Sequence, residues 1–203
     1  MSAMFSELTG RIVALERRLD NLILPDIGGW FWIMEETLPG GDGTVTFNNI
    51  PGHYRHLAVA FQARSDVAAE GDFMLMRFNN DAGANYDHMR KYADANNTFT
   101  ATGAIGGNEI YIAIIEGNTA RANNFAPSII YVQGYALTDR EKWAWCSNSG
   151  RFGDVSALAD MYIADCRGRW KISPVEAITR IDLFPQAGTN FKQHSRFELY
   201  GIL

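Results

Sequence analysis

The sequence predicts a mainly β protein: an antiparallel β-sandwich, jelly-roll-like, behind an N-terminal α-helix that forms a parallel trimeric coiled coil. Apolar residues first recur at helical spacing and then, after Gly28-Gly29, at a spacing of two. Clusters of Gly, Asn and Asp separate the later runs, as in strands joined by tight turns. We therefore divide the chain into a helix at 1–24, a linker with a first strand at 25–43, and a head domain at 44–203.

The N-terminal helix is predicted from a heptad of apolar residues. These alternate at steps of three and four, with the a and d positions taken by Phe5, Leu8, Ile12, Leu15, Leu19 and Leu22. Pro25 follows closely, so the helix must end near Leu24. A stripe this narrow fits a coiled-coil seam better than a helix on a globular core.

Two charged residues indicate how many helices meet. Arg11 falls at g and Glu16 at e of the next heptad, and these positions meet across a parallel coiled coil with opposite signs. The stretch 11–16 also resembles a signature of short parallel trimeric coiled coils, which implies that Arg11 covers the seam and pairs with Glu16 of a neighbouring helix. The alternative is an amphipathic helix docked on its own domain. A coil this short is marginal alone, so the heads or another protein must help to hold the trimer.

The head domain is predicted from runs of strand-like residues. Regular alternation or apolar blocks occur at 54–63, 73–78, 109–116, 128–135, 177–184 and 196–202, and shorter candidates at 30–36, 44–47, 143–146 and 161–164. Both faces of 109–116 are apolar, which predicts a central strand covered on both sides. Turns are expected at 39–43, at 79–83, and at Gly103 with Gly106-Gly107.

Composition and motifs exclude several classes of function. The formal net charge of −5 gives no general attraction to nucleic acid, and no apolar run is long enough for membrane insertion. Hydrolase, phosphate-loop, zinc-protease and dinucleotide motifs are missing, so we expect no enzyme and no cofactor. Cys146 and Cys166 are too few for a disulfide framework, and the sequence leaves open whether they form one bridge or two free thiols.

One loop faintly resembles a calcium site. Asp81, Asn85 and Asp87 present oxygen ligands around Gly83, although no Glu stands where a calcium loop would place its bidentate ligand. The alternative is a turn in which Asp and Asn side chains bind their own backbone, and we favour it.

The aromatic residues suggest a sugar-binding surface. Trp143 and Trp145 alternate and so share one strand face, while Trp170 follows Arg169 in a loop-like stretch. Exposed aromatic rings beside Arg can bind a sugar by stacking and by paired hydrogen bonds. Packing in the core or between subunits is the alternative for each of these tryptophans.

Four segments of the head carry a resemblance. They are FNNIPGHYRHL at 47–57, Arg64-Ser65, RFNNDAGANY at 77–86 and SRFELYGI at 195–202. Together and in this order they resemble a β-domain of tailed-bacteriophage and prophage structural proteins, often found at the C-terminal end of fibre-type chains. That family usually has Gly where Asn80 stands. The resemblance implies a β-sandwich and a structural role in the virion, but no reaction and no named receptor.

These patterns predict a non-enzymatic, trimeric bacteriophage structural protein displayed on the virion surface. We expect a fibre-type protein that contacts the host, including host glycans. The short chain favours an alternative, a capsid decoration protein at threefold positions. A carbohydrate-active enzyme on a β-scaffold is a third hypothesis, and it requires paired carboxylates in a cleft. The expected partners are a second and third copy of the chain, other virion proteins of the capsid or tail, and a host surface glycan.

Overall fold

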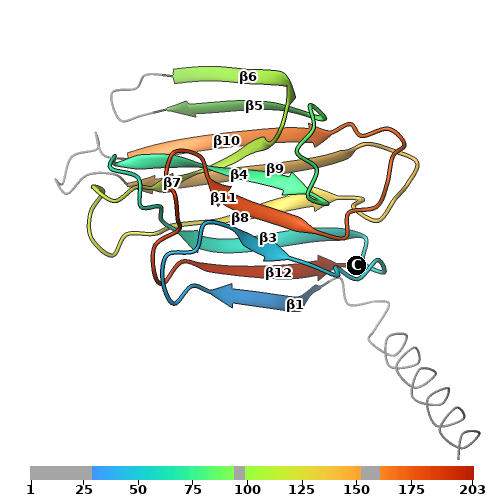
Figure 1. The fold of residues 1–203 in the computed structure, drawn as a ribbon, viewed down its shortest axis with the longest axis horizontal. Coiled ribbons are helices and arrows are strands. Elements are labelled where there is room, and N and C mark those ends of the chain that lie inside the picture. Colours follow the sequence, from blue (N-terminus) through green and yellow to red (C-terminus); the bar gives the residue numbers. More distant parts are fainter. Residues whose placement is uncertain (1–28, 94–98, 152–160) are drawn as a thin grey trace, which may run out of the picture.

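The computed structural model describes residues 29–93, 99–151 and 161–203. They form two antiparallel sheets packed against each other (Figure 1). The helix at 1–24, with every predicted coiled-coil position, lies outside the described residues, so the trimeric stalk stays a prediction. Within the described ranges, no helix is long and apolar enough to cross a membrane.

The described residues contain β-strands and no α-helix. The strands are β1 (Trp30–Thr37), β2 (Val45–Phe47), β3 (His56–Ala63), β4 (Gly71–Phe78), β5 (Tyr86–Ala93), β6 (Phe99–Gly107), β7 (Ile110–Glu116), β8 (Ala126–Gln133), β9 (Lys142–Arg151), β10 (Met161–Trp170), β11 (Ile181–Pro185) and β12 (Arg196–Ile202). The predicted β-sandwich is confirmed, and its first strand, β1, pairs along its length with the last, β12.

Strand order gives the sandwich its jelly-roll-like topology. The large sheet runs β1-β12-β3-β8-β9-β10-β5-β6, and the small sheet runs β2-β11-β4-β7. If β2 to β8 and β11 are taken as the jelly-roll strands, the chain passes from one sheet to the other at every step except β5 to β6, which pair with each other in the large sheet. The hairpin β9–β10 is then inserted beside β8, and β12 and β1 extend the other end of the large sheet.

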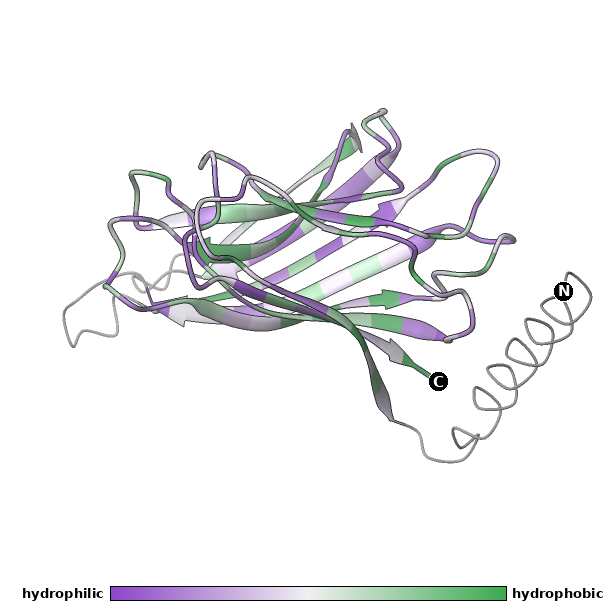
Figure 2. Cartoon of the chain, turned by 60° about the horizontal axis from the view of Figure 1, so that its bottom comes forward, coloured by the Kyte–Doolittle hydropathy of each residue, from purple (hydrophilic) through white to green (hydrophobic). Residues whose placement is uncertain are grey.

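The core lies between the sheets and follows from alternation along each strand. On β3 and β12, for example, Val59, Phe61, Phe197 and Leu199 point inward and are buried, while their neighbours Gln62 and Arg196 are exposed. Figure 2 shows the same alternation as bands of polar and apolar colour along the strands. Burying each large side chain contributes roughly 1.5–3 kcal/mol, which is the main driving force for this packing.

The prediction of a central strand at 109–116 is wrong. β7 is the edge strand of the small sheet, and it is buried because β9 and β10 of the large sheet pack over it. The side-chain amide of Asn148 donates to the Ile114 carbonyl at 2.6 Å, and the Tyr162 hydroxyl donates to the same oxygen at 3.0 Å. Side chains thus satisfy part of the edge that a neighbouring strand would otherwise pair with.

β5 and β6 are strands that the sequence pattern does not predict, and the prediction of a turn at Gly103 is wrong. Gly103 lies inside β6 opposite Met89. A Cβ there would stand 2.4 Å from the His88 carbonyl oxygen, so close backbone approach requires Gly at this position. Ala, Thr and Gly dominate β6, and they give little of the apolar alternation by which strands are recognised.

The segments that carry the family resemblance meet one another in the fold. The ring of Tyr54 lies directly on Gly201, where a Cβ would come within 2.2 Å of it. The buried Ser195 hydroxyl lies 3.2 Å from the backbone nitrogen of Arg64 and accepts a hydrogen bond from it. These residues are therefore fixed by packing between strands distant in the sequence.

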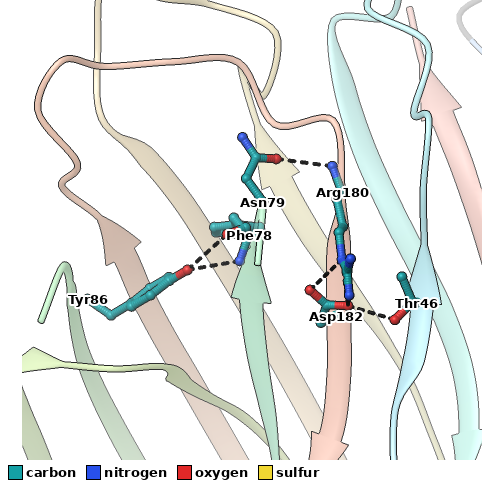
Figure 3. A network of polar contacts seen from close by, with 6 residues as sticks. All are labelled: Thr46, Phe78, Asn79, Tyr86, Arg180 and Asp182. Carbon is teal, nitrogen blue, oxygen red and sulfur yellow. Dashed lines mark hydrogen bonds and ion pairs between the residues drawn. The ribbon is translucent and has the colours of Figure 1, made fainter. Parts of the chain in front are cut away.

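The 77–86 segment plays the same structural role (Figure 3). Asn79 adopts a left-handed backbone conformation, with a φ of 50°, and the similar Asn49 does the same, with a φ of 54°. The side-chain oxygen of Asn79 accepts a hydrogen bond from the Arg180 backbone N–H at 3.1 Å. Asp182 holds the Arg180 guanidinium at 2.7 Å, and the Tyr86 hydroxyl accepts the Phe78 N–H at 2.9 Å. The segment therefore fastens β4 to β11 and to the start of β5.

Candidate functional site

The outer face of the large sheet gathers most of the exposed apolar side chains. Ten large apolar residues stand exposed among the described residues, and strand register places eight of them on this face: Trp30, Trp32, Met89, Phe99, Ile105, Trp143, Met161 and Ile163. Soluble monomers rarely collect so many on one surface without a binding role. We therefore take this outer face as the candidate site.

An aromatic cluster occupies the part of the face over β12, β8 and β9. Trp30 reaches across from β1 and packs on Tyr200 at 5.7 Å and on Tyr131 at 5.8 Å between ring centroids. Tyr131 stacks in turn on Trp145 at 5.4 Å. The small, fully buried Ala58 lies beneath, which leaves room for the rings to meet. Mutual packing fixes their orientation, so the cluster is a rigid surface.

Trp143 stands between grooves on the same face. One groove, of about 850 Å³, runs over β10, β5 and β6 between Trp143 and Ile105, and its lining is mainly apolar. A second, of about 350 Å³, lies on the other side, between Trp143, Trp145 and Arg167. The Trp143 side chain is 49% exposed and forms a wall of both. The predicted pairing of Trp143 and Trp145 on one strand face is confirmed.

Arg169 is held rigidly beside Trp143. Its guanidinium carbon lies 6.0 Å from the Trp143 ring centroid. The same group contacts Asp87 at 2.7 Å and Glu141 at 2.8 Å, from two different strands or loops. Hydrogen bonding to Asp87 is the main reason that the pKa of Arg169 is raised. The two carboxylates orient a planar donor next to an exposed indole, which is the chemistry expected of a sugar contact.

Asp87 is the carboxylate that pairs with both Arg169 and Lys171 on the outer face. Burial raises its pKa, but hydrogen bonds from Lys171, the Gly106 N–H and Arg169 outweigh burial and lower the pKa to about 2. Its carboxylate is therefore ionised throughout the physiological range. A carboxylate with a depressed pKa stabilises the fold above its unfolded value of about 3.9, and this stabilisation is lost as the pH falls toward about 2.

We expect Asp87→Asn to lower the free energy of unfolding by about 1–2 kcal/mol at pH 7, discounted for the partial exposure of its partners. The difference from the unmodified protein should shrink steadily between about pH 4 and pH 2, since both proteins then lack the charge. Urea denaturation at a series of pH values measures it. A difference that stayed constant over that pH range would contradict the role assigned to the ionised carboxylate.

Trp170 does not belong to the surface, contrary to its placement in a loop. It ends β10 on the inner face of the sheet and is only 1% exposed. Its indole N–H donates to Asp81 at 2.7 Å, and its ring packs against Phe78 and Tyr86. Contact with a sugar is excluded for a ring buried this completely. The sequence misled because Gly168 and the charged residues before it imitate a loop.

The candidate calcium ligands form a hydrogen-bonded turn instead of an open cluster. Asp81 accepts the Gly83 N–H at 2.8 Å and the Asn85 side-chain amide at 2.9 Å, in addition to Trp170. Asp87 points to the outer face, where Arg169 and Lys171 neutralise it. In the described part of the chain, no group of three or more acidic, His or Cys side chains is arranged to hold a metal ion.

The two cysteines lie directly opposite each other on β9 and β10 and are free thiols. Both Cys146 and Cys166 are fully buried on the inner face. Burial is the main cause that raises the pKa of each thiol to about 12. Thiols with so high a pKa are unreactive at neutral pH, so these residues serve as core packing.

Sequence reasoning missed the half of the site that β5 and β6 provide. Met89 and Ile105 line the larger groove, and Tyr131 completes the aromatic cluster. The available signal was that Asp87, Met89 and Lys91 occupy every second position and therefore share one face of β5. Two of the three are charged, which hides the apolar alternation by which a strand is recognised. The site joins strands distant in the sequence, and strand order alone brings them together.

No protein-family model matches the chain, and a search of curated proteins finds no match. The resemblance to phage structural proteins therefore remains a prediction.

Proposed function

We propose that the chain is a non-enzymatic, trimeric structural protein of a bacteriophage virion, of the fibre type, whose large sheet binds a sugar chain of the host surface. Trp143 carries the binding part of this proposal, because an exposed indole wall stands between two grooves with Arg169 fixed beside it. The virion part rests on the four resembling segments and on the heptad at the N-terminus.

The charges of the face favour a neutral or weakly charged sugar. Arg167 is paired with Asp165 at 3.1 Å, and Arg169 and Lys171 are paired with Asp87 at 2.7 Å each. An acidic polysaccharide would have to displace these carboxylates before it reached the guanidinium groups. A neutral sugar can instead stack on the indole and use donors and acceptors that are already oriented.

The proposal predicts that Trp143→Ala reduces sugar binding at least tenfold, since one aromatic platform contributes more than about 1.4 kcal/mol in a small site. The measurement is binding of the full chain to an array of neutral and acidic bacterial oligosaccharides, followed by titration of the best binder. Ile163→Ala, on the same face but away from both grooves, is the matched control.

If the Trp143→Ala protein bound the sugar as tightly as the unmodified protein, the sugar site would have to lie elsewhere. If the unmodified protein bound no sugar at all, the glycan part of the proposal would be wrong. Copy number per particle then separates the fibre from the decoration protein. A few trimers at the tail support the fibre, whereas hundreds over the shell support decoration of the capsid. The many exposed apolar residues of the outer face keep decoration of the capsid as the second candidate.

The enzyme hypothesis gains little from the structure. Asp87 and Glu141 do form a carboxylate pair beside the groove, bridged by Arg169. Glycoside hydrolysis needs one carboxyl group that holds a proton near neutral pH, and the depressed pKa of Asp87 gives the opposite property. Release of reducing ends from a host polysaccharide would revive this hypothesis.

A further inference from the structure

Each sheet of the sandwich has two edges, and three of the four carry a feature that blocks further pairing. β1 is irregular between Trp32 and Met34 and carries Glu35 and Glu36. β2 is only three residues long. β7 is covered by the large sheet, with side chains bonded to Ile114. Such features are how natural sheets avoid joining one another edge to edge.

β6 is the exception. It is nine residues long and contains neither a charged residue nor Pro. It pairs with β5 on one side, and within the described ranges nothing pairs with its other side. Figure 1 shows it at the top of the view with only β5 next to it. Most of the strand is exposed, and Ile105 is 85% exposed. An edge of this length and composition is a template for another strand.

We propose that β6 pairs antiparallel with β6 of a second copy of the chain, so that the two large sheets become one continuous sheet. Self-pairing of an uncharged strand sets no like charges opposite each other, whereas self-pairing of β1 would bring glutamates together. The small side chains of Ala101 and Ala104 permit close approach. Phe99 and Ile105 beside the edge would be covered by the same residues of the second copy.

The proposed contact has twofold symmetry, so it yields an even number of copies. The predicted helical stalk, in contrast, yields three. A dimer therefore supports β6 pairing without the stalk, and a hexamer supports both. A trimer supports the stalk and overturns β6 pairing, and a monomer overturns both. The two proposals thus fail in distinguishable ways.

The experiment is light scattering on the full chain, whose monomer mass is 22.6 kDa, at micromolar concentration. We expect an even multiple of that mass, and we expect the double variant Ala101→Lys, Ala104→Lys to halve it, because the added charges repel across the twofold axis. Both positions are exposed, so the fold should tolerate the change. Thr37→Lys, on the opposite edge of the large sheet, is the matched control and should leave the mass unchanged.

Hydrogen exchange gives a second measurement that does not depend on the variant. Amides of β6 should be protected in the assembled protein and exchange at least tenfold faster when dilution separates the copies. A mass that the lysine pair leaves unchanged, or β6 amides that exchange at one rate at every concentration, would overturn the proposal.

Discussion

Arg64→Met should lower the free energy of unfolding by about 4 kcal/mol or more. The Arg64 guanidinium is buried and donates to the backbone oxygens of Ala120 at 2.7 Å, Arg121 at 2.6 Å and Asn118 at 3.0 Å. Without it, the loop that follows β7 loses donors that water cannot fully replace. Methionine keeps the length of the side chain, so the measured loss reports the guanidinium itself.

The effect of Arg64→Met should depend on pH through Glu116. This carboxyl group is fully buried, and burial raises its pKa despite the N–H donors and the nearby Arg64. A carboxyl group with a raised pKa contributes stability that is present below its unfolded value and is lost as the pH rises. Removal of the neighbouring cation should therefore cost more at pH 7 than at pH 4.

Urea denaturation at the two pH values tests this. Adding Glu116→Gln to the Arg64→Met protein should recover part of the loss at pH 7, because the buried negative charge is then removed. Arg196→Met is the control: that side chain is half exposed, and its loss should change stability by less than about 0.5 kcal/mol. An Arg64→Met protein as stable as this control would show that the carbonyl oxygens need no guanidinium.

Trp170→Ala should lower the free energy of unfolding by about 3–5 kcal/mol, and Trp143→Ala should change it by less than about 0.5 kcal/mol. Trp170 fills the core between Phe78 and Tyr86, and its removal leaves a cavity and takes a donor from Asp81. Trp143 projects from the outer face, so truncation leaves no cavity.

The two substitutions should therefore have opposite effects in a stability assay and in a sugar-binding assay. We expect Trp170 to govern stability and, under the proposed function, Trp143 to govern sugar binding, although the sequence grouped them in one candidate site. Denaturation curves for both variants, read beside their sugar binding, measure this separation. Similar losses of stability in the two proteins would mean that Trp143 is packed in the assembled particle or oligomer and is no free binding wall.

The four segments on which the resemblance to phage structural proteins rests pack against one another in the sandwich, and the resemblance itself stays a prediction. Its segments contain the residues that join distant strands, such as Arg64 with Ser195 and Tyr54 with Gly201. The contacts of these residues form only when the distant strands are packed together in this fold. Trp143 and Arg169 lie outside all four segments, so the resemblance says nothing about what the outer face binds.

The sequence by itself determined which residues alternate inward and outward, because apolar residues stand at every second position along β3 and β12. It also predicted that Trp143 and Trp145 share a face. Only the tertiary structure decided that β7 lies at an edge, that Trp170 is buried, and that β5 and β6 complete the groove beside Trp143. These properties depend on strand order, and strand order is set by packing between segments far apart in the chain. A pattern of neighbouring residues contains no information about that packing.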